Sequence, residues 1–504
     1  MKSKIPSWFW LLIGSILMLF SNGRWIFPIC TWIYPFCFLL YLHTNKKFNA
    51  LIYLFLCSGL INTFAWWKIV PLPLPAYLFV MMIGINLFMT IPFYIDKIFQ
   101  NRSNRFIRTF IFPISWVSLE FLHNNLLSKG SWMSIAYTQF DFLPLLQIVS
   151  ITGIYGITFM IGWFASSAVY FTERNFEWNK VRTQIYSIAG FFALIIFTGF
   201  LRIHRFNSRQ TVQVAAIVQE RTINKELNSC RWTDAKAISN YSGQIEENLL
   251  TKTREAARKG AKIILWQESA GFLPRSKVSV FVDSAISLAS KEKIYLLMTL
   301  WSVPNNFPNE LVENKLMLID PTGKIQFSYL KSNPAPPEPI VKGKGNMPYF
   351  DSEFGRISAA ICYDADFPSF IRKAGEINSD IMFIPANDWK EIDPLHSHMA
   401  IIRAIENGFS LVHPAGQGLS VIVNPVGQIL EEMDYYSDEG QILYGNVPVK
   451  SIATIYSKVG DLFAFINIGT FVCIVCYLVS LQIKAIMQKI NRGPLFRVFR
   501  PMKN

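Results

Sequence analysis

The sequence is short of charged side chains for its length of 504 residues. Charged residues make up only 16% of it, against about 25% in an average soluble protein. Because 51% of the residues are hydrophobic, the deficit excludes a disordered or fibrous protein and also an ordinary soluble enzyme. The composition indicates a chain that is partly embedded in a membrane and partly globular.

Cysteine is also scarce, and its distribution argues against a disulfide framework. Most of the seven cysteines lie within apolar runs, where Cys behaves as a small hydrophobic residue. Only Cys230 and Cys362 fall in the more polar part, and two thiols alone are weak evidence for a bond. The sequence also lacks HExxH, a Cys/His cluster, a P-loop and GxGxxG, so it points to no metal and no other cofactor.

Long apolar runs are present, and they are concentrated in two parts of the chain. A helix needs about 20 apolar residues to span a bilayer. Seven candidate spans precede the polar part and an eighth follows it, at about 5–20, 25–42, 51–67, 76–95, 106–122, 145–170, 185–201 and 463–483. The first has a basic start, but residues 21–24 are a poor cleavage site for a signal peptide, so we expect an uncleaved anchor.

Basic residues between the spans predict the orientation of the chain. If Met1 is inside, the inner connections carry clusters of Lys and Arg, whereas the short outer ones carry only Arg24, Lys68 and Lys129. Such a bias marks the cytoplasmic side. Much of the formal net charge of +14 then reflects topology, and no basic-aromatic cluster suggests nucleic acid binding.

These features divide the chain into four parts. We expect a membrane domain with about seven transmembrane helices, an extracytoplasmic domain, a last transmembrane helix and a basic cytoplasmic tail. Their ranges are 1–207, 208–455, 456–484 and 485–504, respectively. Nothing in the sequence points to a particular oligomeric state.

The polar part has the alternating pattern of an α/β domain, in which helices cover sheets. Apolar stretches typical of buried strands alternate with stretches of helical periodicity. The expected strands are 212–218, 262–266, 294–300, 315–320, 324–330, 356–361, 380–384, 418–423 and 428–430, and the expected helices are about 232–259 and 395–407. The turns at 320–323 and 424–427 predict two hairpins.

Three chemically reactive residues come directly after predicted strands: Glu268, Lys331 and Cys362. Sites in α/β proteins collect beyond the carboxyl ends of strands. A thiol is a good nucleophile once a base such as a carboxylate removes its proton. An ammonium can stabilise both the thiolate and the oxyanion of a tetrahedral intermediate. Together the three could carry out acyl transfer through a thioester without a metal.

Each of these residues taken alone has a simpler interpretation. Cys362 behind an apolar strand is typical of a core cysteine, Glu268 of a helix cap or surface charge, and Lys331 of a solvated lysine. His396 and His398 could suggest a metal or a Cys–His pair, but their spacing places them on different faces of a helix. We expect them to start or pack the helix.

Short motifs surround the three candidates and together cover most of residues 212–447. They are Trp266-Gln267-Glu268, Tyr329-Leu330-Lys331, Ile361-Cys362-Tyr363-Asp364, Phe367-Pro368, Asn387-Asp388-Trp389 and the helix from His398 to Gly408. In this combination they resemble the nitrilase, or carbon–nitrogen hydrolase, superfamily. The resemblance implies a four-layer α-β-β-α sandwich and a Glu–Lys–Cys triad.

The membrane part carries further motifs. They are Pro113-Ile114-Ser115-Trp116-Val117-Ser118-Leu119-Glu120, then Trp132, Tyr137 and Gln139, then Pro144-Leu145-Leu146-Gln147, and Gly153-Ile154-Tyr155-Gly156-Ile157-Thr158-Phe159. These resemble the apolipoprotein N-acyltransferase family, whose plan is eight spans with a nitrilase-like domain between the seventh and the eighth. The resemblance implies a multi-pass protein of the bacterial cytoplasmic (inner) membrane, with its catalytic domain on the extracytoplasmic side.

The resemblance also implies a reaction. A thiolate takes a fatty acyl chain from a phospholipid, and the N-terminal amine of a diacylglyceryl-cysteine lipoprotein then attacks the thioester. By this resemblance Cys362 is the nucleophile, Glu268 the general base and Lys331 the oxyanion stabiliser. The supporting residues are Glu338, a second glutamate after the lysine, with Tyr363, Asp364 and Asn387. No cofactor is implied.

Two departures from the family keep other functions open. Asp364 stands where the family usually has Glu, and the short segment between Glu338 and Cys362 is polar and glycine-rich rather than an apolar lid. A membrane-tethered amidase or nitrilase, in which water resolves the thioester, is therefore the alternative. A non-catalytic scaffold or carrier is a third, although the apolar spans show no paired charges of the kind that a substrate path needs.

Overall fold

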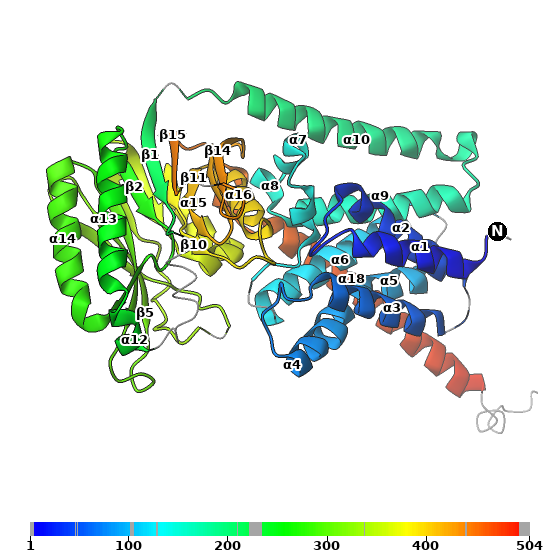
Figure 1. The fold of residues 1–504 in the computed structure, drawn as a ribbon. Helices are drawn as coiled ribbons and strands as arrows, with labels where there is room; N and C mark the ends of the chain where they lie inside the picture. Colours follow the sequence, from blue (N-terminus) through cyan, green and yellow to red (C-terminus); the bar gives the residue numbers. More distant parts are fainter. Residues whose placement is uncertain are drawn as a thin grey trace, which may run out of the picture.

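The computed structural model describes residues 5–492 apart from 46, 48, 101–104, 128–129, 209, 221–233, 337 and 439–440. Two parts meet side by side: a helical part and an α/β part (Figure 1). Residues 230 and 493–504, which include Cys230 and most of the expected basic tail, lie outside the described residues.

Apolar helices build the helical part. They are α1 (Ser7–Leu19), α2 (Pro28–Thr44), α3 (Asn49–Ala65), α4 (Leu74–Phe79), α5 (Asn86–Phe99), α6 (Ile111–Leu122), α9 (Tyr155–Glu173), α10 (Trp178–Arg205) and α18 (Leu462–Arg492). Among the described residues, three helical stretches are long and apolar enough to cross a membrane: Leu74–Phe99, Trp178–Arg205 and Leu462–Lys484. The expectation of eight crossings stays a prediction.

The span expected at 145–170 is not one straight helix. α7 (Leu143–Leu146) and α8 (Val149–Thr152) come first, and the chain then bends by 116° into α9. The bend lies at Gly153, which has φ +63°, and a Cβ there would lie 2.7 Å from the Tyr456 ring. Ile154 N donates to Glu406 Oε1 at 3.1 Å, so residues of the α/β part hold the bend.

Charged side chains pair within the helical part, at or just beyond the ends of the predicted apolar spans. His43 at the end of α2 bridges Asp96 (2.6 Å) and Glu173 (2.8 Å), and Arg108 binds Glu173 at 2.6 Å. His43, Asp96 and Glu173 lie in the last turns of α2, α5 and α9, and Arg108 lies in the short 3-10 helix that precedes α6. Because they neutralise one another there, the cluster ties helix ends together rather than lining a path.

Two large sheets and a two-stranded one, β10 (Ala386–Asn387) with β12 (Ala415–Gly416), form the described α/β part. The seven-stranded sheet has the order β15-β1-β2-β4-β5-β6 with β3 beside β4, and the six-stranded sheet has the order β14-β13-β11-β9-β8-β7. The first contains β1 (Thr211–Ile217), β2 (Ile263–Trp266), β3 (Gly271–Pro274), β4 (Tyr295–Val303), β5 (Glu313–Ile319), β6 (Ile325–Leu330) and β15 (Ile442–Pro448). The second contains β7 (Tyr349–Ser352), β8 (Gly355–Ala359), β9 (Ile381–Phe383), β11 (Ser410–His413), β13 (Leu419–Val423) and β14 (Ile429–Asp434).

Both expected hairpins are confirmed, because β5–β6 and β13–β14 pair antiparallel. The helix expected at about 232–259 is instead divided into α12 (Ala235–Ser239) and α13 (Ser242–Arg258). The helix expected at 395–407 is confirmed as α16 (Leu395–Asn407). It ends at Gly408, whose φ of +76° gives the left-handed cap that glycine favours.

Alternation along the strands decides which faces meet. One buried cluster joins alternate residues of the seven-stranded sheet, such as Val214 and Leu265, to residues of the other sheet, such as Ile357 and Leu411. A second cluster joins the opposite face to α13 and to α14 (Val278–Glu292). α16 and α15 (Pro368–Glu376) lie between the six-stranded sheet and the helical part (Figure 1).

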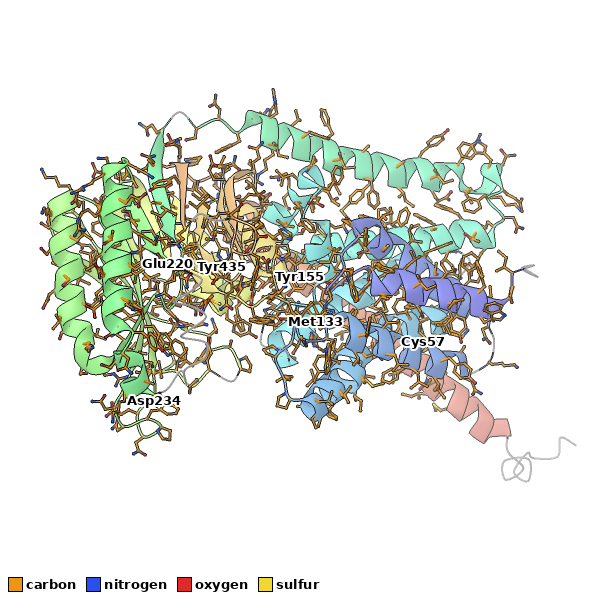
Figure 2. The ribbon with its side chains drawn as sticks, in the orientation of Figure 1. Cys57, Met133, Tyr155, Glu220, Asp234 and Tyr435 are labelled. Carbon is orange, nitrogen blue, oxygen red and sulfur yellow. The ribbon has the colours of Figure 1, made fainter. Side chains whose placement is uncertain are left out.

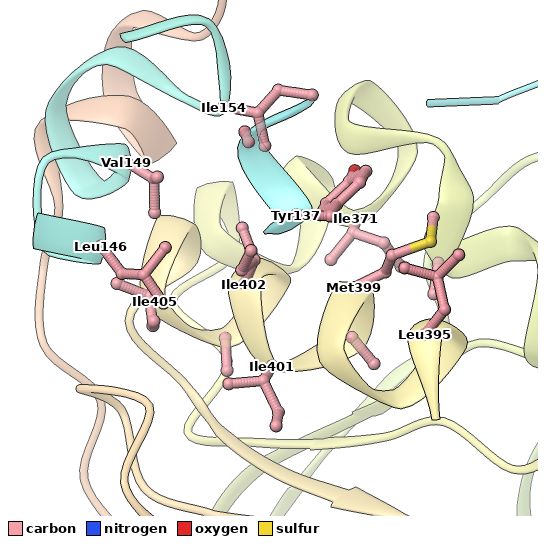
Figure 3. Close-up of a cluster of buried hydrophobic side chains, with 14 of the residues drawn as sticks. Tyr137, Leu146, Val149, Ile154, Ile371, Leu395, Met399, Ile401, Ile402 and Ile405 are labelled. Carbon is pink, nitrogen blue, oxygen red and sulfur yellow. The ribbon is translucent and has the colours of Figure 1, made fainter. Parts of the chain in front are cut away.

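The junction of the two parts is apolar and continuous. Figure 2 places Tyr155 at this junction and Cys57 well inside the helical part. Side chains of α16 and α15 interleave there with residues that precede α9 (Figure 3). They are Ile371, Leu395, Met399, Ile401, Ile402 and Ile405 on one side, and Tyr137, Leu146, Val149 and Ile154 on the other.

A fully buried ion pair lies in this junction. Arg403 Nη1 is 3.0 Å from Glu406 Oε2, and both side chains are completely covered. Arg403 also donates to the hydroxyl of Tyr137 at 2.9 Å. The pair therefore gives α16 two polar contacts with the helical part, through Tyr137 and through the amide of Ile154.

We expect Arg403→Met to loosen this junction. Removing one partner of a buried pair leaves an uncompensated charge, which costs about 3–5 kcal/mol. The measurement is the midpoint of thermal unfolding of the detergent-solubilised protein, which should fall. Lys259→Met is the control, because the Lys259–Glu255 pair lies on the surface, and its midpoint should not move. Equal midpoints for both variants would contradict the prediction.

Candidate active site

Glu268 and Lys331 meet beyond the carboxyl ends of their strands. Glu268 follows β2 and Lys331 follows β6. Lys331 Nζ lies 2.9 Å from Glu268 Oε1 and 2.9 Å from Glu338 Oε1. Lys331 is 0% exposed and Glu268 is 3% exposed. A buried ammonium is therefore held between two carboxylates.

The two carboxylates have further donors that fix their positions. Glu268 Oε1 accepts from Asn314 Nδ2 at 2.7 Å, and Glu268 Oε2 accepts from the backbone N–H of Asn387 at 3.0 Å. Glu338 Oε2 accepts from the backbone N–H of Ala335 at 2.9 Å. Of the predicted supporting residues, Glu338 thus contacts Lys331 directly, and Asn387 acts on Glu268 through its backbone.

The charges around Lys331 keep it protonated. Burial would lower the pKa of Lys331, but Glu268, Cys362 and Glu338 outweigh this effect and raise that pKa well above its usual value. Lys331 N donates to Asn314 O, and Gly343 N donates to Lys331 O at 2.8 Å. A Cβ on Gly343 would lie 2.1 Å from Leu330 O, so this close approach requires glycine.

Cys362 lies at a strained turn between β8 and a short 3-10 helix (Cys362–Asp366). Its φ of +46° is in the left-handed region, which is unfavourable for a residue with a side chain. Its N–H donates to Pro385 O at 2.8 Å, and its side chain is partly exposed. Burial and then Glu268 raise the pKa of Cys362, while Lys331 lowers it. The net shift is well upward, so the resting thiol needs a base.

Asp364 braces this turn. Its carboxylate accepts from the Tyr329 hydroxyl (2.6 Å), from Asn333 N (2.7 Å) and Nδ2 (3.0 Å), and from Ile361 N (3.0 Å). Tyr329 and Asn333 flank Lys331 in the sequence, and Ile361 precedes Cys362. Asp364 therefore links the segment that carries the lysine to the segment that carries the thiol.

A second group of ionisable side chains borders Cys362. Its Sγ, a carboxylate oxygen of Asp388 and a ring nitrogen of His396 lie within 4.8 Å of one another. His396 Nδ1 is 2.7 Å from Asp388 Oδ1, and its Nε2 is 3.5 Å from Asp366 Oδ1. Spacing in the sequence did not reveal this group, because its members come from three separate segments.

Two further histidines of the α/β part, His398 and His413, have different surroundings. His398 stacks on Phe140 with ring centroids 3.8 Å apart, so it packs α16 as expected. His413 Nδ1 lies 2.6 Å from Ile384 O. Burial lowers the pKa of each to about 4, which keeps both neutral.

The helical part reaches the site through residues 131–132. Trp132 Nε1 donates to Asp366 Oδ2, and Ser131 N donates to Asp366 O at 2.9 Å. The Trp132 ring lies against Tyr363 and Trp389, with centroids 5.7 Å and 5.8 Å apart. Tyr363, a predicted supporting residue, thus joins an aromatic group shared by both parts of the chain.

We expect Asp364→Ala to loosen the turn at Cys362. The change leaves several buried donors unpaired, each at a cost of about 1–3 kcal/mol. The midpoint of thermal unfolding and the rate of Cys362 alkylation should both fall. Asp351→Ala is the control, because Asp351 is an exposed ion-pair partner of Arg356. An Asp364→Ala variant that matches this control in both measurements would refute the bracing role.

Comparisons with known families cover most of the chain. A model described as "Carbon-nitrogen hydrolase" matches residues 215–456. A model described as "Apolipoprotein N-acyltransferase N-terminal domain" matches residues 14–167. The first model thus covers the α/β part of the chain, and the second covers much of the helical part.

Individual proteins also match over most of the chain. An apolipoprotein N-acyltransferase of Rickettsia typhi is 26% identical over 395 residues, which are 74% of this chain and 76% of that protein. Apolipoprotein N-acyltransferase 1 of Treponema denticola is 23% identical over 93% of this chain and 95% of its own. Among solved structures, an amidase from Nesterenkonia sp. is 22% identical over 51% of this chain and 95% of its own, with a TM-score of 0.39.

Proposed function

Because the chain belongs to the apolipoprotein N-acyltransferase family, we propose that it moves a fatty acyl chain from a phospholipid to the N-terminal amine of a diacylglyceryl-cysteine lipoprotein. It is an acyltransferase enzyme of lipoprotein biosynthesis, and a bacterial membrane protein. The proposal concerns the two substrates and the chemistry. One observation carries it: Lys331 lies between Glu268 and Glu338. Cys362 is near enough that its charge also raises the pKa of Lys331.

The first half-reaction forms a thioester. Glu268 takes the proton of the Cys362 thiol, and the thiolate attacks the ester carbonyl carbon of the phospholipid. Lys331 stabilises the oxyanion that forms. The carbon–oxygen bond of the ester then breaks, the lysophospholipid leaves with the proton held by Glu268, and the acyl chain stays on sulfur.

The second half-reaction transfers the chain to nitrogen. The neutral amine of the lipoprotein attacks the thioester carbonyl, and Glu268 takes the proton that the nitrogen releases. The carbon–sulfur bond breaks, an amide forms, and the thiolate recovers its proton from Glu268. Every step uses the same carboxyl, ammonium and sulfur, with no cofactor.

Aromatic side chains support a lipid substrate. Trp132, Tyr363 and Trp389 form a group beside the nucleophile, and Trp132 comes from the helical part. We propose that these rings guide the acyl chain toward Cys362.

We further propose that the α/β part, with helices outside two facing sheets, is a four-layer α-β-β-α sandwich. This domain, residues 208–455, would lie on the extracytoplasmic side of the inner membrane. Residues 1–207 and 456–484 would contain the membrane helices, and residues 485–504 would form the cytoplasmic tail.

One observation favours the alternative of a membrane-tethered amidase or nitrilase. The polar segment before Cys362 does not project as an apolar lid but is held at the site, where Gly345 N donates to Ser332 Oγ at 3.2 Å and Lys373 Nζ donates to Gly345 O at 2.6 Å. In this alternative the same Glu268, Lys331 and Cys362 act, and water resolves the thioester.

We expect the purified protein to convert phospholipid and a diacylglyceryl peptide into lysophospholipid and an N-acylated peptide. Cys362→Ala should abolish both products because no nucleophile remains, and Cys362→Ser should nearly do so because a hydroxyl is far less acidic. Mass spectrometry of the wild type without acceptor should show an acyl group on Cys362. Release of ammonia from small amides, with no lysophospholipid, would overturn the transferase in favour of the hydrolase.

We expect Lys331→Met to reduce the rate of thioester formation by about 10²–10³-fold, because the oxyanion loses its cation. Lys324→Met is the matched control: it lies at the other end of the same hairpin and is exposed, so its rate should equal that of the wild type. Thermal unfolding of each variant separates lost chemistry from lost folding. A folded Lys331→Met variant with the full rate would rule out the role of Lys331.

A further inference from the structure

Negative charge is crowded around the sulfur of Cys362. Asp388 has a carboxylate oxygen within 4.8 Å of Sγ. Glu268, Asp388 and Glu338 each raise the pKa of the thiol, whereas Lys331 lowers it. Like charges at this range disfavour a thiolate strongly in a buried site. One lysine shared between two glutamates leaves the charge of Asp388 without a counterion from that cluster.

His396 supplies the missing counterion. Its side chain is 2% exposed, its Nδ1 lies 2.7 Å from Asp388 Oδ1, and its Nε2 lies 3.5 Å from Asp366 Oδ1. The other ionisable groups that face it are His413, with ring centroids 5.7 Å apart, Cys362 and Glu268. Burial would lower the pKa of His396, but Asp388 and Asp366 raise it to about 9.

The same geometry argues against a metal at this place. A metal ligand must offer a neutral ring nitrogen with a free lone pair, and both nitrogens of His396 face carboxylates. Simple packing is also a poor explanation. The neighbouring His398 and His413 face no such pair of carboxylates, and burial keeps them neutral.

We propose that His396 is a positioning residue for the reaction: its imidazolium neutralises Asp388 beside Cys362 and so makes the thiolate accessible at neutral pH. This role rests on the proposed function of Cys362 as the nucleophile. Asp366 holds the far side of the ring. Because Trp132 and Ser131 bind Asp366, the helical part helps to fix the ion pair.

The test measures alkylation of Cys362 by iodoacetamide in the full-length, detergent-solubilised protein, between about pH 6 and 7.5, well below the pKa of about 9 of His396. Mass spectrometry of the Cys362 peptide separates this thiol from the other cysteines. In His396→Gln the charge of Asp388 is unopposed. Over this range, which lies below the pKa of the thiol, the rate rises with pH, and we expect the whole profile of His396→Gln to move by about one pH unit to higher pH, so that the rate at pH 7 falls about tenfold.

A double variant distinguishes charge from structure. Asp388→Asn removes the charge that His396 neutralises, so the double variant His396→Gln/Asp388→Asn should alkylate within about threefold of the wild type. A purely structural role would make the double variant slower still. His398→Gln, two residues away on α16, is the matched control and should keep the wild-type profile.

Two results would overturn the role of His396: a His396→Gln profile that coincides with that of the wild type, or a double variant as slow as His396→Gln alone. Acyl transfer is measured on the same preparations. A wild type that shows the expected alkylation profile but never forms an acyl thioester with phospholipid would overturn the proposed function instead.

Discussion

The site depends on one buried cation. Lys331 is completely covered and lies 2.9 Å from a carboxylate oxygen on each side. A buried ammonium is stable only when it is paired. Moving Glu268 or Glu338 away from Lys331 would therefore leave an uncompensated buried charge and destabilise the fold. This requirement holds β2, β6 and the segment around residue 338 in one arrangement. The position of the proposed base follows from it, because the same oxygen of Glu268 that meets Lys331 also accepts from Asn314.

A second set of charges connects the candidate active site to the helical part. Asp366 faces His396 with one oxygen and accepts from Trp132 with the other. Trp132 lies in the helical part, 234 residues earlier in the chain. The surroundings of Cys362 are therefore completed only when the two parts dock. For the proposed reaction on lipids, this arrangement places the sulfur of Cys362 beside residues contributed by the helical part.

Much of the α/β part could be predicted because its signals are local. Apolar runs indicated β2, β6 and β8, and a chemically reactive residue follows each of them. Glu268, Lys331 and Cys362 could thus be named before their contacts were known. Other elements, such as β15 and α14, were not predicted.

The sequence by itself determined the apolar helices, the alternation of strands and helices, and the residue types at the strand ends, because each depends on neighbours within a few positions. Only the tertiary structure decided the 116° bend before α9 and the surroundings of His396. Both depend on partners far away in the chain: Tyr456 and Glu406 hold the bend, while Asp366 and Asp388 hold the ring. Spacing cannot reveal such partners, because folding and not sequence distance brings their charges together.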